Sequence, residues 1–120
     1  FKQINDSFGN PGGDVVLKSF GRLLANSARA SDIVARIGGE EFAIVMPRTN
    51  LQQATHWAES LTKTLSEKTF SIEQENLRVS VSIGISTLDE EVSDITALIK
   101  MADRALYQAK AAGRDCYKVA

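Results

Sequence analysis

The stretch from Leu77 to Ile85 alternates apolar and polar positions without a break, and it restricts the possible folds more than any other part of the chain. Its apolar positions are Leu77, Val79, Val81, Ile83 and Ile85. Because successive side chains of a strand point to opposite faces, this pattern predicts one strand with a single buried face. Such a strand belongs in a sheet whose apolar face is covered by other elements.

Three stretches with apolar residues at helical spacing predict the covering helices. The first is expected over residues 14–29, where Val16, Phe20, Leu23 and Leu24 would share a face. The second is predicted to begin after Thr49 or Asn50, either of which can serve as its N-cap. The third is predicted to start after a cap at Asp94. Gly113 is expected to end it.

Two glycine-containing segments predict turns. Residues 8–13 concentrate Gly, Asn and Pro, which predicts a loop before the first helix. Gly38 and Gly39 separate two runs rich in β-branched and aromatic residues, 32–37 and 41–46. This arrangement predicts a hairpin with a two-glycine turn, in which the glycines supply the positive φ that a tight turn requires.

With short strands at 70–72 and near the tail, the expected order is helix, two strands, helix, two strands, helix and strand. That order predicts an α+β sandwich, with helices on a mostly antiparallel sheet. A chain of 120 residues has room for one hydrophobic core, so residues 1–120 are predicted to form a single domain.

Composition excludes several classes of function. The 14 Lys and Arg against 15 Asp and Glu leave a net charge of −1, which provides no field to hold nucleic acid or an anionic membrane. One Cys and one His exclude an internal disulfide and a Cys/His zinc site, and a cytoplasmic location is expected. No apolar run approaches the length of a membrane span, so this domain is expected to make no membrane contact, although a longer parent protein could be membrane-anchored.

The segment Gly38-Gly39-Glu40-Glu41 is the strongest candidate for a functional site, because its glycines let a ligand approach the backbone beside two carboxylates. A solvated turn carrying two acids is the alternative, and it is the commoner outcome for so short a motif alone. Further polar residues elsewhere in the chain favour a site. They are Asn5, Asp14, Arg29, Asp32, Lys110 and Arg114.

These motifs, in this order, make the chain resemble the GGDEF domain family, the diguanylate cyclases of bacterial signalling. The resembling segments are residues 1–6, 8–9, 13–14, 38–42, 81–86, 102–110 and 113–114. The resemblance implies a palm-like nucleotidyl-cyclase (ferredoxin-like) sandwich and the joining of two GTP into cyclic di-GMP with release of two pyrophosphates. It also implies that a helix, a central strand and a metal-ligating Asp precede Phe1 in the family. The chain is therefore expected to cover the C-terminal three-quarters of the domain and to be inactive alone.

The resemblance implies a role for each matching residue. Glu40 is expected to ligate Mg²⁺ or Mn²⁺ and to act as base for the attacking ribose hydroxyl, with Glu41 beside it in the catalytic site. The residues implied in GTP binding are Asn5, Asn10, Asp14, Gly38, Gly39, Lys110 and Arg114. Lys110 and Arg114 would neutralise the triphosphate; the alternative is that they are helix-end cations. Asn10 stands where the family usually has His.

A second site is implied by Arg29 and Asp32, which match the family's Arg-x-x-Asp inhibitory site for the product cyclic di-GMP. The alternative is a surface ion pair of little energetic value. The spacing to Gly38 favours the product site. Ser60 stands where many members have a further Arg, which is expected to weaken product binding.

The resemblance also implies partners. Each domain holds one GTP, so two domains must face each other, and a homodimer is expected for catalysis. Control of that geometry usually belongs to an attached sensory or receiver domain. Two other hypotheses remain open: a catalytically silent module that binds GTP or cyclic di-GMP and regulates an attached domain, and a structural dimerisation domain. The intact acids favour the enzyme.

Overall fold

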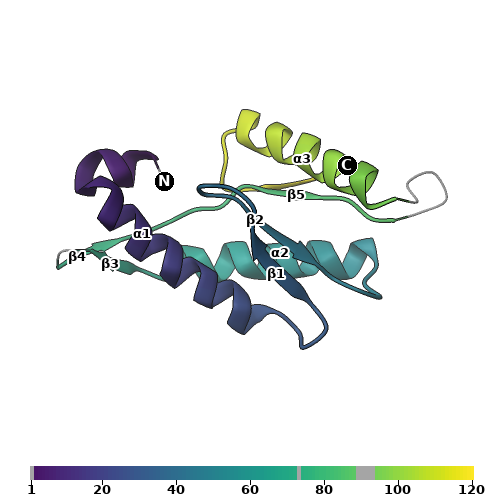
Figure 1. The fold of residues 1–120 in the computed structure, drawn as a ribbon, viewed down its shortest axis with the longest axis horizontal. Helices are drawn as coiled ribbons and strands as arrows, with labels where there is room; N and C mark the ends of the chain where they lie inside the picture. The colour runs from purple at the N-terminus through teal and green to yellow at the C-terminus, as the bar shows by residue number, and fades with distance from the viewer. Residues whose placement is uncertain (1, 73, 89–93) are drawn as a thin grey trace. The chain divides into compact units, whose positions relative to one another are not determined.

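The computed structural model describes residues 2–72, 74–88 and 94–120, with side chains from residue 12 onward. Its elements are α1 (Lys2–Ser27), β1 (Ile33–Arg36), β2 (Phe42–Val45), α2 (Leu51–Glu67), β3 (Phe70–Ile72), β4 (Glu75–Leu77), β5 (Ile83–Ile85), α3 (Ile95–Ala111) and β6 (Tyr117–Val119) (Figure 1). They fall into two compact units, which are described separately. The first comprises residues 1–48 and 68–79, and the second residues 49–67 and 80–120.

The core of the first unit lies between α1 and the strands that it covers, β1 and β3. Residues Val16, Leu17 and Leu24 of α1 are buried, as are Phe70 and Ile72 of β3. Removing these side chains from water supplies the main driving force for folding. Of the predicted stripe, Val16 and Leu24 are buried and Phe20 and Leu23 are half-buried, while Leu17 is a buried residue that the prediction did not include.

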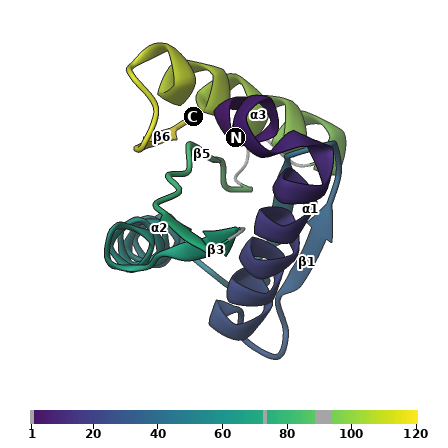
Figure 2. The same cartoon turned by 90° about the vertical axis from the view of Figure 1, so that its left-hand side faces the viewer.

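Helix α1 is longer than predicted, because the loop expected at residues 8–13 is helical. Gly and Pro are poor helix formers, at about 1 and 3 kcal/mol relative to Ala, but extending a helix costs less than starting one. Gly12 and Gly13 are buried, so this turn contributes to packing. The N-terminal, purple part of α1 bends away from the rest of the helix (Figures 1 and 2), as Pro- and Gly-containing helices commonly do.

Strands β1 and β2 form the predicted antiparallel hairpin, with a register from Ile33 opposite Val45 to Arg36 opposite Phe42. The connection is longer than the predicted two-glycine turn. The amide of Ile37 donates to the carbonyl of Glu41 at 2.9 Å, so the loop closes over residues 37–41. The expectation of positive φ at the two glycines was wrong, since Gly113 is the one described glycine with positive φ. The loop over residues 37–41 is long enough to reverse the chain without positive φ at Gly38 or Gly39.

The single strand expected from Leu77 to Ile85 was also wrong. Leu77 ends β4, which pairs antiparallel with β3, and Ile83 begins β5, which pairs parallel with β6. Residues 78–82 between them are not in a strand. Alternation of apolar and polar residues indicates which side chains face the core, but a strand also needs neighbouring strands to which its backbone can hydrogen-bond. In the part of the chain that the structure describes, neighbours exist only at the two ends of this stretch.

The second unit packs α2 and α3 with the β5–β6 pair. The buried side chains are Ala58, Leu61 and Leu65 of α2, Ile85 of β5, and Ala105 and Ala109 of α3. Gly84 allows α3 to lie directly on β5, because a Cβ at this position would overlap the carbonyl oxygen of Ala102 and the amide of Leu106. The hydroxyl of Tyr117 on β6 donates to Glu59 of α2 at 2.7 Å.

The helix ends of the second unit lie where the capping residues in the sequence predict them. Asn50 caps α2, with its side chain accepting from the amide of Gln53 at 2.8 Å while Gln53 accepts from the amide of Asn50 at 3.0 Å. Asp94 caps α3 by accepting from the amide of Ala97 at 2.8 Å. Gly113, with φ of 108°, follows the end of α3. These predictions are confirmed.

Candidate functional site

The predicted signature lies in the loop that joins β1 to β2 in the first unit. Glu40 is exposed and Glu41 is half-buried. Phe42 anchors the loop to α1, since its ring meets that of Phe20 edge-on with centroids 5.3 Å apart and also faces Gly21. The apolar residue next to the two acids is thus fixed in the fold, while Glu40 is left accessible to solvent.

The local fold does not require glycine at positions 38 and 39. Neither has the positive φ that favours glycine. A Cβ on Gly39 would meet nothing within 4 Å, and one on Gly38 would make an ordinary contact with Glu41 at 3.6 Å. Glycine in a loop carries an entropic cost. Neither space nor backbone conformation therefore explains the glycine pair.

Arg36 is a residue of this site that the sequence analysis did not single out. Its Nε donates to the carbonyl oxygen of Gly38 at 3.2 Å, and its Nη2 donates to the carbonyl oxygen of Gly39. The sequence shows an arginine with five donors two positions before the glycine pair, but it does not show which acceptors those donors reach.

Arg29 and Asp32 lie together at the start of the same hairpin. Arg29 Nη2 lies 3.2 Å from Asp32 Oδ1, the amide of Arg29 donates to Asp32 Oδ2 at 2.8 Å, and Arg29 Nη2 also donates to the carbonyl of Pro47 at 3.4 Å. The Asp32 side chain is 1% exposed and that of Arg29 is 52% exposed. Burial opposes ionisation of Asp32, but the hydrogen bonds and charge of Arg29 hold its pKa below the ordinary value.

Lys110 and Arg114 belong to the second unit, at the C-terminal end of α3. Lys110 is half-buried and Arg114 is exposed. The amide of Arg114 donates to the carbonyl of Ala109 at 3.0 Å, and Arg114 has φ of 65°. This position also suits cations that complement the helix dipole, so the geometry agrees with both interpretations of the pair. Ser60 is exposed on α2 of the same unit.

The three residues expected to contact the nucleotide from the N-terminal part all lie within α1. Asp14 is exposed and stands inside this helix, so the expectation that it opens a helix was wrong. The backbone at Asn5 and Asn10 is helical. Their side chains are outside the described part of the structure, and their predicted roles remain predictions.

The donor set suits a divalent cation that also binds substrate. Among the described residues, no group of three or more His, Cys, Asp or Glu side chains is placed to hold a metal. Mg²⁺ commonly binds through one or two carboxylates together with substrate phosphates, and it prefers hard oxygen ligands. The exposed carboxylate of Glu40 fits that mode of binding.

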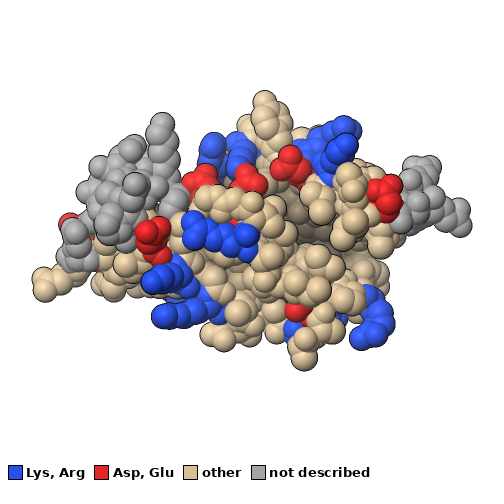
Figure 3. Space-filling view, in the orientation of Figure 1, with Lys and Arg blue, Asp and Glu red and all other residues tan. Residues whose placement is uncertain are grey.

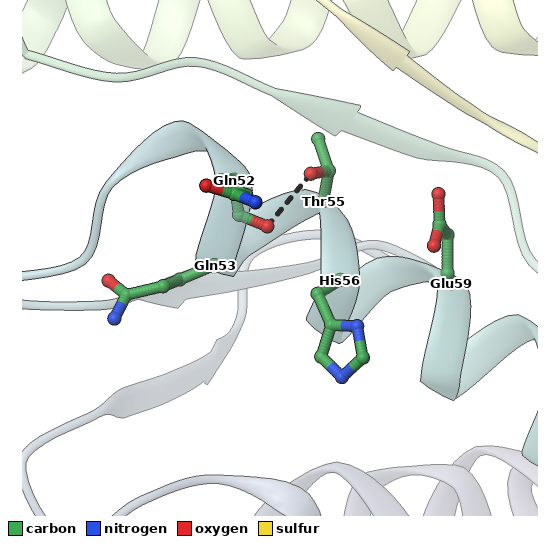
Figure 4. Close-up of a pocket in the computed structure, with 5 residues that line it drawn as sticks. All are labelled: Gln52, Gln53, Thr55, His56 and Glu59. Carbon is green, nitrogen blue, oxygen red and sulfur yellow. Dashed lines mark hydrogen bonds between the residues drawn. The ribbon is translucent and has the colours of Figure 1, made fainter.

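Other surface features of the described residues do not contain the predicted site. A shallow polar hollow on α2 is lined by Gln52, Gln53, Thr55, His56 and Glu59, with Thr55 donating to the carbonyl of Gln52 at 2.9 Å (Figure 4). Basic and acidic side chains are interspersed on the face drawn in Figure 3. None of the described helices is long and apolar enough to cross a membrane.

Comparison with known proteins identifies one family. The family model described as "Diguanylate cyclase, GGDEF domain" matches residues 1–116. Response regulator PleD of Caulobacter vibrioides is 44% identical over 117 residues, which are 96% of this chain and 26% of that protein. The chain therefore spans about a quarter of the length of this curated relative.

Solved structures give the same result. The active GGEEF domain of a diguanylate cyclase from Vibrio cholerae has a TM-score of 0.86 and 34% identity, covering 98% of this chain and 74% of that one. The GGDEF domain of DgcB from Caulobacter crescentus, solved in complex with c-di-GMP, has a TM-score of 0.91 and 26% identity, covering 98% and 70%. The α+β fold predicted from the sequence is that of these domains.

Proposed function

Because this chain belongs to the GGDEF domain family of diguanylate cyclases, we propose that it condenses two molecules of GTP into cyclic di-GMP and releases two pyrophosphates. The observation that carries the proposal is the hairpin loop. Its two glycines are not required by the fold, and the exposed Glu40 follows them directly. A nucleotide that lies against the bare backbone would bring its reacting groups next to this carboxylate.

Glu40 is the residue proposed to do the chemistry. A carboxylate can accept the proton of the ribose 3′-hydroxyl that attacks the α-phosphate of the second GTP. It is also a hard oxygen ligand for Mg²⁺ or Mn²⁺, which when bound would neutralise charge on the phosphates. Lys110 and Arg114 are proposed to bind the triphosphate, and Asn5, Asn10 and Asp14 to contact the nucleotide.

The reaction requires two copies of the domain. Each copy holds one GTP, and each 3′-hydroxyl must lie in line with the α-phosphate held by the other copy. Positioning two reactants in this way converts an encounter in solution into an oriented reaction. We therefore propose a homodimer as the catalytic form, whose geometry an attached sensory or receiver domain would control.

Arg29 and Asp32 are proposed to bind the product. The GGDEF domain of DgcB was solved in complex with c-di-GMP, and here the half-exposed side chain of Arg29 is already paired with the buried carboxylate of Asp32 in the first unit. The guanidinium of Arg29 is half exposed and can take a phosphate or a guanine edge. Because Arg29 also pairs with Asp32, a ligand must compete with or share that ion pair.

The experiment that tests the proposal compares Glu40→Gln with the wild-type protein in the presence of GTP and Mg²⁺. Removing the charge without changing the size of the side chain is expected to reduce cyclic di-GMP formation about a hundredfold or more, in the range of a lost general base. Glu75→Gln, at an exposed acid of β4 in the same unit, is the matched control and should retain activity.

The same pair of variants separates the enzyme from a silent binding module. Measurable product from the wild type and almost none from Glu40→Gln supports the assignment. Equal turnover by both proteins would show that Glu40 is not the essential acid. Binding of GTP without any product from the wild type would favour the regulatory module.

A further inference from the structure

Arg36 ends β1, and its side chain binds the backbone of the loop that follows. Nε and Nη2 donate to the carbonyl oxygens of Gly38 and Gly39, two consecutive peptide groups. A guanidinium can make both bonds at once because it is planar and presents its donors in a fixed fork. One side chain therefore holds the two glycines of the loop.

These bonds also set the direction of the next amides. A peptide group is planar, and in the trans form its N–H points opposite to its C=O; no cis peptide bond occurs in the described residues. With both carbonyls turned toward Arg36, the N–H groups of Gly39 and Glu40 point away from it. Neither amide donates to a protein acceptor in the described part of the chain.

We propose that Arg36 is a positioning residue of the site, which holds the loop so that the amides of Gly39 and Glu40 face the bound nucleotide. This inference rests on the proposed function. Successive N–H groups on one side of a loop form a concave donor site for an anionic oxygen, and a phosphate oxygen of GTP is the matching acceptor. The same two hydrogen bonds from Arg36 also restrict the backbone conformation at Glu40, whose carboxylate is the proposed catalytic group.

The test uses three variants of the intact protein: Arg36→Lys, Arg36→Ala and the control Arg22→Ala, which removes an exposed arginine of α1 in the same unit. Lysine keeps the charge but has one ammonium group that cannot form the fork. Both Arg36 variants should therefore lower kcat about tenfold or more, because small errors in positioning reduce rates strongly. Arg22→Ala should have wild-type kcat and KM.

Amide order parameters measured by NMR without nucleotide provide a readout that does not depend on activity. In both Arg36 variants the values at Gly39 and Glu40 should fall from about 0.85 toward 0.6 or below, while those in β1 and β2 stay unchanged. Loss of order confined to the loop distinguishes a positioning role from general destabilisation. Should Arg36→Ala fail to fold, Arg36→Lys carries the same comparison.

Two results would overturn the inference. One is unchanged order at Gly39 and Glu40 in both Arg36 variants, which would mean that the two bonds do not hold the loop. The other is a loop that loosens while kcat and KM remain those of Arg22→Ala. If the wild type makes no cyclic di-GMP, GTP binding replaces kcat as the readout. Weaker binding in the Arg36 variants would then support the inference while the proposed function fails.

Discussion

At the scale of single residues, Arg36 shows what a sequence motif omits. The two acids and two glycines were recognisable from the sequence because residue type alone indicates that Glu supplies a carboxylate and that Gly leaves the backbone accessible. The role of Arg36 depends on two hydrogen bonds to carbonyl oxygens, and every residue has a carbonyl. Only the path of the loop reveals which carbonyls an arginine can reach.

Gly39→Ala should separate stability from function. A Cβ at this position meets nothing within 4 Å, so the variant should be as stable as the wild type or more stable by up to about 1 kcal/mol, since alanine restricts the unfolded chain. Cyclic di-GMP formation should nevertheless fall, because the added methyl occupies the space proposed for the nucleotide. Urea unfolding and product quantification measure the two effects. A stable variant with full activity would remove the main support for ligand approach at this loop.

Asp32→Asn should change stability in a pH-dependent way. The folded-state pKa of Asp32 is lowered, so the ionised group stabilises the fold above its ordinary pKa of 3.8, and this contribution is lost as the pH falls through the folded-state value. The variant should be less stable by about 1 kcal/mol at pH 7. The difference should shrink as the pH approaches 3. Unfolding measured from pH 7 to pH 3 tests this, with Asp103→Asn on α3 as control; a constant difference would contradict it.

At the scale of elements, the sequence predicted helix ends well where they depend on residues close by in the chain. The cap at Asp94, the cap of α2 and the stop at Gly113 depend on neighbours three to five residues away; the first and last were correct, and Asn50 is the one of the two predicted candidates, Thr49 or Asn50, that caps α2. The limits of α1 and of the strand at Leu77–Ile85 depended on distant packing and pairing partners. Periodicity cannot identify these partners, and both predictions needed correction.

Gly84→Ala should destabilise the second unit, in contrast to Gly39→Ala. A Cβ here would overlap backbone atoms of Ala102 and Leu106, and backbone cannot move aside as a flexible side chain can. The expected loss is about 3 kcal/mol, at the upper end of typical overpacking costs. Urea denaturation of the two alanine variants side by side provides the comparison. Equal stability of Gly84→Ala and the wild type would mean that α3 does not rest on β5 as described.

At the scale of the whole molecule, the predicted roles are divided between the two units. Glu40, Arg36 and the Arg29–Asp32 pair belong to the first unit, whereas Lys110 and Arg114 belong to the second. The proposed reaction needs acidic and basic groups at one nucleotide. Family membership was accessible from the sequence because several motifs occur in a fixed order, whereas the roles of these groups toward GTP remain proposals.

The measurement that tests the central claim most directly is the stoichiometry of the reaction. The intact protein is incubated with GTP and Mg²⁺, and cyclic di-GMP and pyrophosphate are quantified by mass spectrometry and a coupled assay. The account predicts two pyrophosphates for each cyclic di-GMP, with no accumulation of GDP. Release of GDP and phosphate without cyclic product would contradict it, because that outcome identifies a GTP hydrolase.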